Sequence, residues 1–145
     1  MAPKVAGTWH LHQLTQSHPL DFFICFSSIA SLIGSPGQGN YAAANAFMDA
    51  LMSRRRSIGL PGLSINWGPW GDTGESAGMA ARLDASTQDR MRARGVNPLT
   101  PEQAFKLLDE ILIDSLNQPI AQVGAFSVDW PKFTAQLPPG ESLPV

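Results

Sequence analysis

The sequence predicts an α/β domain, in which a parallel sheet carries helices on both of its faces. Helix-type and strand-type patterns alternate along the chain, as is typical of sheets whose parallel strands are connected through helices. The strand-type segments are short and mostly apolar, which indicates interior strands. Only three such segments are present, so the chain looks like one half of a larger fold.

The first two elements are a helix and a strand. Apolar residues recur at loose helical spacing from Val5 to Leu14, and His18–Pro19 ends this pattern. Leu20 to Phe26 is an apolar run rich in aromatic and β-branched residues. We therefore expect an interior strand there, ending at Ser27–Ser28.

The middle of the chain predicts a loop, a helix and a second strand. Glycine and proline punctuate Gly34 to Gly39, which favours a loop. Tyr41 to Arg56 is rich in good helix formers and has an apolar stripe, and its closing arginines are expected to be solvated. Leu63 to Trp67 is the second strand, and residues 71 to 95 are expected to form a mobile loop with a short helix.

The last part of the chain predicts a helix, a strand and a tail. Thr100 to Gln103 have the pattern of a capping box, with a proline suited to the first helical turn. The helix that they begin ends near Asn117. Ile120 to Val128 is expected to be the third strand, and Pro131 to Val145 is a proline-rich tail.

Composition excludes several classes of protein. The 145 residues are 43% apolar and 15% charged, with a net charge of −2. This argues against disorder, and the lack of excess basic charge argues against a nucleic-acid partner. The longest apolar run, Phe22 to Phe26, is too short to span a membrane. With Cys25 as its single cysteine, the chain is expected to be soluble and cytoplasmic.

Four polar residues suggest chemistry on a carbonyl group. Tyr41 and Asn45 share a helical face, and Ser28 ends a strand where ligands bind in open α/β sheets. A tyrosine hydroxyl has an ordinary pKa of about 10, and a nearby ammonium favours the phenolate. Lys4 is the candidate lysine early in the chain. A serine hydroxyl can hold a carbonyl oxygen while negative charge develops on it.

Other reactive residue types are expected to be structural. His10, His12 and His18 do not fall on one helical face, and no cysteine or carboxylate cluster joins them, so we expect no metal site. Cys25 lies inside an apolar strand pattern and is interpreted as a small buried hydrophobic residue.

The chain closely resembles the ketoreductase domain of modular type I polyketide synthases, within the short-chain dehydrogenase/reductase superfamily. Four stretches carry the resemblance, APKVAGTWHLHQLT, FFICFSSIASLIGSPGQGNYAAANAFMDAL, GLPGLSINWGPW and GVNPLTPEQAFKLLDEIL. It implies a partial Rossmann-like fold, whose N-terminal nucleotide-binding strands would lie before Met1. We expect residues 1–133 to be the C-terminal catalytic portion of the domain and residues 134–145 to be a tail or linker.

The resemblance also implies an activity. It is the NADPH-dependent reduction of a β-ketoacyl group on an acyl carrier protein to a β-hydroxyacyl group. Tyr41 resembles the proton donor, and Ser28, rather than Ser27, resembles the hydrogen-bond partner of the carbonyl. Lys4 matches the lysine of the family's APKVxG motif. Asn45 stands where most short-chain reductases have the lysine of YxxxK.

Further positions match the cofactor and substrate regions of the family. Gly68, Pro69 and Trp70 match the loop that the family packs against the nicotinamide. Residues 72–95 resemble its substrate lid. Ile33 replaces a tryptophan found in reductases that give the L-alcohol, which favours the D-alcohol type.

A second hypothesis is a truncated, non-catalytic module. Three strands leave a sheet edge and apolar helix faces exposed, so the chain could associate with itself or with a separate nucleotide-binding half. The remaining expected partners are other polyketide synthase domains.

Overall fold

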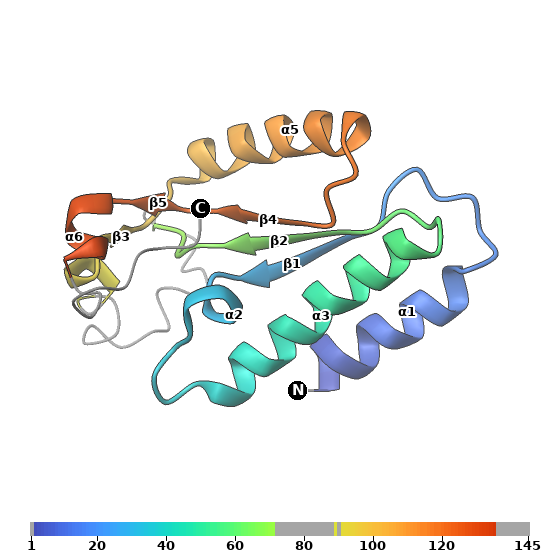
Figure 1. The fold of residues 1–145 in the computed structure, drawn as a ribbon, viewed down its shortest axis with the longest axis horizontal. Helices are drawn as coiled ribbons and strands as arrows, with labels where there is room; N and C mark the ends of the chain where they lie inside the picture. Colours follow the sequence, from blue (N-terminus) through green and yellow to red (C-terminus); the bar gives the residue numbers. More distant parts are fainter. Residues whose placement is uncertain (1, 72–88, 90, 136–145) are drawn as a thin grey trace. The chain divides into compact units, whose positions relative to one another are not determined.

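The computed structural model describes residues 2–71, 89 and 91–135. Figure 1 shows the elements of this part of the chain, in the order η1 Pro3–Gly7, α1 Thr8–Thr15, β1 Ile24–Ser28, α2 Ala30–Ile33, α3 Gly39–Ser57, β2 Leu63–Trp67, β3 Val96–Asn97, α5 Pro101–Asn117, β4 Gln122–Ala125, β5 Ser127–Val128 and α6 Trp130–Thr134. The chain divides into two compact units, Met1–Trp67 with Lys106–Ala125, and Gly68–Phe105 with Phe126–Val145.

A three-stranded parallel sheet lies in the first unit, with strand order β1-β2-β4. Ile24 pairs with Leu63 at the start of β1, and Ser28 pairs with Trp67 at its end. Every residue of the central strand β2 is buried. Figure 1 shows α1 and α3 on one face of this sheet and α5 on the other. The structure therefore confirms the predicted parallel sheet with helices on both faces.

An apolar cluster joins α3 to the sheet. It consists of Cys25 from β1 and Met48, Leu51 and Met52 from α3, each no more than 7% exposed. Burying a side chain of the size of leucine or methionine contributes about 1.5–3 kcal/mol. Burial also raises the pKa of the Cys25 thiol to about 11, so it stays protonated, in agreement with its expected structural role.

Two predicted strands have different bounds in the structure. The strand expected over Leu20 to Phe26 begins only at Ile24, and before it the backbone N–H of Leu20 closes a turn on the carbonyl of His18 at 2.9 Å. The strand expected over Ile120 to Val128 is two strands. β4 pairs with β2 in parallel, whereas β5 pairs antiparallel with β3.

The second unit contains the β3–β5 ribbon and α6. The N–H of Lys132 donates to the Asp129 carboxylate at 3.2 Å and thereby caps α6, a helix in the region expected to be tail. Gly95, just before β3, has a positive φ of 77°.

The expected mobile loop and lid fall largely on residues 72–88 and 90, and most of the expected tail falls on 136–145; these residues lie outside the described part.

None of the helices that the structure describes is long and apolar enough to cross a membrane. Within the described residues, no group of three or more histidine, cysteine, aspartate or glutamate side chains is placed to hold a metal ion.

Candidate functional site

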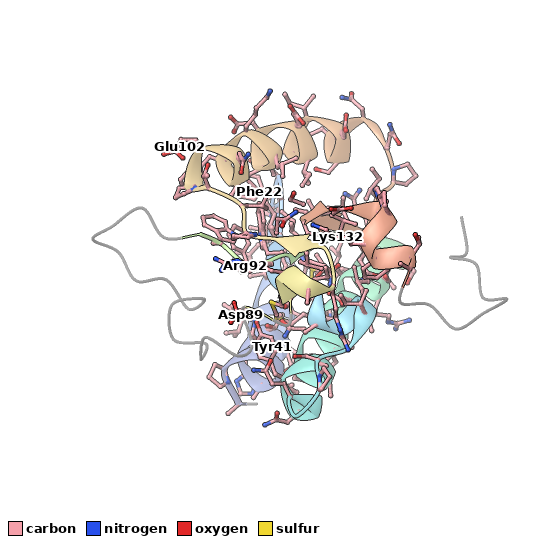
Figure 2. The ribbon with its side chains drawn as sticks, turned by 90° about the vertical axis from the view of Figure 1, so that its left-hand side faces the viewer. Phe22, Tyr41, Asp89, Arg92, Glu102 and Lys132 are labelled. Atoms are coloured by element: carbon pink, nitrogen blue, oxygen red, sulfur yellow. The ribbon has the colours of Figure 1, made fainter. Side chains whose placement is uncertain are left out.

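Tyr41 lies on the first turn of α3, as Figure 2 shows. The loop before it turns at Gly34 and Gly37, both with φ of 76°. The Asn40 side-chain oxygen then accepts from the Tyr41 backbone N–H at 2.8 Å, which satisfies one of the free donors at the start of a helix. The Tyr41 side chain is half-buried.

Lys4 lies against Tyr41, although 37 residues separate them in the sequence. Its Nζ is 5.6 Å from the centroid of the Tyr41 ring, a distance at which an ammonium is attracted to an aromatic face. The same Nζ donates to the backbone carbonyl of Phe26 at 3.2 Å. Lys4 belongs to η1, a turn of π-helix, so this short segment places its ammonium between α3 and β1.

Asn45 follows one turn after Tyr41 and is fully buried. Its Nδ2 donates to the Tyr41 carbonyl at 2.8 Å. Its Oδ1 is buried and has no hydrogen-bond partner in the described part of the chain. An unsatisfied buried polar atom costs about 1–3 kcal/mol, so this acceptor is a place where a donor from outside the chain would be stabilised.

Ser28 closes β1 and begins the turn into α2. Its hydroxyl accepts from the Ala30 backbone N–H at 3.2 Å, and the side chain is half-buried. Ser27 points to the opposite face, into the protein, where its hydroxyl donates to the Asn45 carbonyl at 3.4 Å. Among the described hydrogen bonds, none joins the hydroxyls of Ser28 and Tyr41. The structure thus brings Lys4 and Asn45 to Tyr41, and it holds Ser28 separately at the end of its strand.

A buried polar cluster next to these residues was not predicted. Asp49 lies at its centre and is 6% exposed. Ser31, Ser64, Asn66 and Gln122 complete the cluster, which we call the Asp49 network. Two signals in the sequence point to it. Asp49 continues the spacing of four residues that joins Tyr41 to Asn45, and Ser64 and Asn66 are polar residues in a short strand whose other residues are apolar.

Gly68, Pro69 and Trp70 begin the second unit and are held by its own backbone. The N–H of Leu99 donates to the Pro69 carbonyl at 2.8 Å, and the N–H of Gly71 donates back to the Leu99 carbonyl at 2.7 Å. The Trp70 ring meets Phe105 edge to face, with their centroids 6.0 Å apart. These contacts give the segment a fixed backbone.

Comparisons with known proteins agree with one another. Residues 1–72 match the family model described as the KR domain. The chain is 42% identical over 142 residues to a phenolphthiocerol synthesis polyketide synthase type I, Pks15/1, of Mycobacterium marinum, covering 98% of this chain and 6% of that protein. It is 48% identical over 110 residues to the spectinabilin polyketide synthase system protein NorB of Streptomyces orinoci, covering 76% of this chain and 5% of that protein.

Solved structures show the same likeness in three dimensions. The structure of A-type ketoreductases from a modular polyketide synthase is 40% identical, with a TM-score of 0.75 over 94% of this chain. An A1-type ketoreductase is 38% identical, with a TM-score of 0.76. This chain spans 28% of each of those solved chains, so it corresponds to part of their fold. The family model, the relatives and the solved structures together show that the chain belongs to the ketoreductase domain family of modular polyketide synthases.

Proposed function

We propose that this chain is the catalytic portion of a polyketide synthase ketoreductase. The reaction is the NADPH-dependent reduction of a β-ketoacyl thioester on an acyl carrier protein to the β-hydroxyacyl thioester. The observation that carries the proposal is the Lys4 ammonium, 5.6 Å from the Tyr41 ring centroid on a half-buried face of α3. Family membership supplies the reaction class, and this pair supplies a proton donor with a cation beside it.

The proton is the part of the reaction that these residues handle. Tyr41 gives its hydroxyl proton to the carbonyl oxygen of the substrate as that oxygen gains negative charge. The positive charge of Lys4 stabilises the phenolate that remains on Tyr41. The Ser28 hydroxyl donates a hydrogen bond to the same substrate oxygen, and this favours the transition state over the ground state.

Asn45 has a different role in this proposal. Its unpaired Oδ1 is buried one helical turn from Tyr41. We assign this oxygen to a bound water that returns a proton to Tyr41 through a hydrogen-bonded chain. A buried water of this kind needs polar partners, and Asn45 Oδ1 provides one acceptor.

The cofactor class follows from the family, because ketoreductases of the short-chain type use a nicotinamide cofactor. The residues around Tyr41 fit the ribose end of such a molecule, since the Lys4 ammonium and the Tyr41 hydroxyl are the groups that bind sugar hydroxyls. Gly68, Pro69 and Trp70 are the proposed packing surface for the nicotinamide ring. When bound, NADPH supplies the hydride that reduces the β-carbon.

The test uses a complete ketoreductase. The solved A-type ketoreductase is the host, and this chain replaces the 28% of it that matches. Tyr41→Phe is expected to lower kcat for a β-ketoacyl thioester by about a hundredfold or more, the usual contribution of a general acid. Ala43→Ser, at an exposed position of the same helix, is the control and is expected to keep the activity. Full activity in the Tyr41→Phe chimera would show that Tyr41 is not the proton donor.

A second candidate, a non-catalytic module that associates through its sheet, is favoured by one observation. β1 lies at an edge of the sheet, and the large side chains of Phe22, just before the strand, and Phe26, within it, are 66% and 50% exposed. Such an edge can pair with a second copy of the chain or with a separate nucleotide-binding half. Light scattering over a concentration series is expected to show growing mass for the chain and less growth for Phe22→Lys. A stable monomer at high concentration would contradict this candidate.

A further inference from the structure

The Asp49 network contains a buried carboxylate whose described partners are all neutral. Asp49 Oδ1 accepts from the Ser64 hydroxyl at 2.5 Å, and Oδ2 accepts from the Ser31 hydroxyl at 2.6 Å. Asn66 Nδ2 donates to Oδ2 at 3.0 Å. Both oxygens of Asp49 are therefore satisfied by donors that converge from α2 and β2.

The network extends from Asp49 to the backbone of Ser28. Asn66 Nδ2 lies 3.3 Å from the Ser28 carbonyl oxygen, and the Ser31 hydroxyl lies 2.9 Å from it. Asn66 Nδ2 also lies 3.2 Å from the Ser27 hydroxyl, which in turn donates to the Asn45 carbonyl. Ser31 and Asn66 thus lie between Asp49 and the end of β1. The single Ser31 hydroxyl proton serves either Asp49 or the Ser28 carbonyl, whereas Asn66 Nδ2 has two protons and can contact both.

Asp49 is also connected to Tyr41 through α3 itself. Tyr41, Asn45 and Asp49 follow one another at intervals of four residues, so they share one face of this helix. The helix is joined to the strand end through Ser31 and Asn66. One side chain thus links the element that carries Tyr41 with the strand end that carries Ser28.

Stability does not explain why a carboxylate occupies this place. Removing a charged group from water costs several kcal/mol, and well-packed apolar residues often give an equal or greater stability. The apolar cluster of Cys25, Met48, Leu51 and Met52 on the same helix shows that α3 can also pack by apolar contact alone.

We propose that Asp49 is a positioning residue, which holds the Ser28 hydroxyl in register with Tyr41 by fixing Ser31 and Asn66. This inference rests on the proposed function for its effect on catalysis. The other half of the proposal, that Asp49 orders the turn from Ser28 into α2, does not depend on the proposed function. The Ala30 backbone N–H reports on that turn directly, since it donates to the Ser28 hydroxyl oxygen.

The first measurement is amide hydrogen exchange on the full chain. Asp49→Asn keeps the size of the side chain but replaces one acceptor oxygen with a donor, so Ser31 and Ser64 cannot both donate to it. Exchange at Ala30, Leu32 and Ile33 is expected to be at least about tenfold faster than in the unchanged chain, as for a locally opened segment. Ser31→Ala, at a half-buried position, is the milder second variant and is expected to act in the same direction.

A matched control separates positioning from general destabilisation. Leu51→Ala removes a buried side chain from the same helix, 5% exposed in the apolar cluster, without touching the Asp49 network. Exchange at the three reporter amides is compared under conditions that give all variants the same free energy of unfolding. If Asp49→Asn and Ser31→Ala leave these amides as protected as Leu51→Ala does, the proposal is overturned.

The second measurement is kinetic and uses the chimeric ketoreductase. Asp49→Asn is expected to lower kcat by about ten- to a hundredfold, as a misplaced catalytic group does, while KM stays within about twofold. A chimera inactive before any substitution would count against the proposed function and leave the exchange result standing. An active chimera in which Asp49→Asn keeps its kcat would overturn the positioning role alone.

Discussion

Arg55 shows at the scale of single residues what the sequence pattern cannot reveal. The three arginines that close α3 were predicted to be solvated, but Arg55 is fully buried. Its Nε donates to the Pro61 carbonyl at 2.7 Å, its Nη1 lies 3.1 Å from His12 Nδ1, and its guanidinium is 4.0 Å from the Phe23 ring centroid. These partners come from α1 and two loops, so only the tertiary fold identifies them.

Protonation of His12 is expected to weaken the fold. Burial lowers the pKa of His12 below its usual value, and the charges of Arg55 and Arg54 lower it further. The folded chain therefore keeps His12 neutral where the unfolded chain takes up a proton. The free energy of unfolding contributed by this group is fully present above a pH of about 6.5 and is lost progressively as the pH falls below it.

Urea unfolding at pH values of about 7.5 and about 5.5 measures this loss. His12→Gln removes the titrating group and is expected to reduce the difference between the two pH values. His10→Gln, at an exposed position of the same helix, is expected to leave the difference unchanged. An equal pH dependence in the unchanged chain and in His12→Gln would contradict the assignment.

At the scale of elements, the start of α5 was predicted from local sequence and is confirmed. The Thr100 N–H donates to Gln103 Oε1 at 2.9 Å, and the Gln103 N–H donates to Thr100 Oγ1 at 3.3 Å. Thr100→Ala removes the cap and is expected to lower the free energy of unfolding by about 1 kcal/mol, measured by urea unfolding. Thr100→Ser keeps the hydroxyl and serves as the control, so an equal loss in both variants would exclude the cap as the cause.

The short elements could not be predicted because their stability comes from non-local contacts. β3 has two residues, Val96 and Asn97, and pairs with β5 some thirty positions later in the chain. The four-residue helix α2 is joined to α3 by the hydrogen bond from the Ser31 hydroxyl to Asp49. Such segments carry too few residues for a periodic pattern. The long helices and the central strand, which do carry one, were predicted close to their observed bounds.

Gly95 is the residue on which the β3–β5 ribbon most depends. Its φ is 77°, and an added Cβ would lie 2.7 Å from the Asp129 carbonyl oxygen and 3.1 Å from Lys132 Cβ. Gly95→Ala is therefore expected to be more destabilising than Gly59→Ala, which has a φ of 79° but nothing within 4 Å of the added atom. Positive φ alone costs an L-residue about 1 kcal/mol. Urea unfolding compares the two variants, and equal losses would exclude the steric contact.

At the scale of the whole molecule, the candidate site was predicted in part. Tyr41, Asn45 and Lys4 could be identified from sequence, because helical spacing and family motifs are properties of the sequence. The structure brings these three residues together. Asp49 and Asn66 were missed, since a lone aspartate on a helix and a lone asparagine in a strand gain meaning only when the two elements pack. Their roles in catalysis remain predictions.

The connections that follow the parallel strands bear on the proposed NADPH site. A nucleotide pyrophosphate is bound by a glycine-rich turn between a strand and the first turn of a helix. In the described residues, Ile29 alone lies between β1 and α2, and β2 is followed by Gly68 and Pro69, so neither connection has this pattern. In the proposed site, the groups around Tyr41 are therefore assigned to the ribose end of NADPH.

We therefore expect NADPH to bind the chimeric ketoreductase at least about tenfold more tightly than it binds this chain alone, because each lost phosphate contact removes charge-assisted hydrogen bonds. Isothermal titration calorimetry on both proteins measures the two affinities. NADH, which lacks the 2′-phosphate, is the matched control ligand and tests the preference for NADPH in the chimera. Equal NADPH affinity in the two proteins would mean that this chain carries a phosphate site of its own, and the assignment of Tyr41 and Lys4 to the ribose end would then have to be replaced.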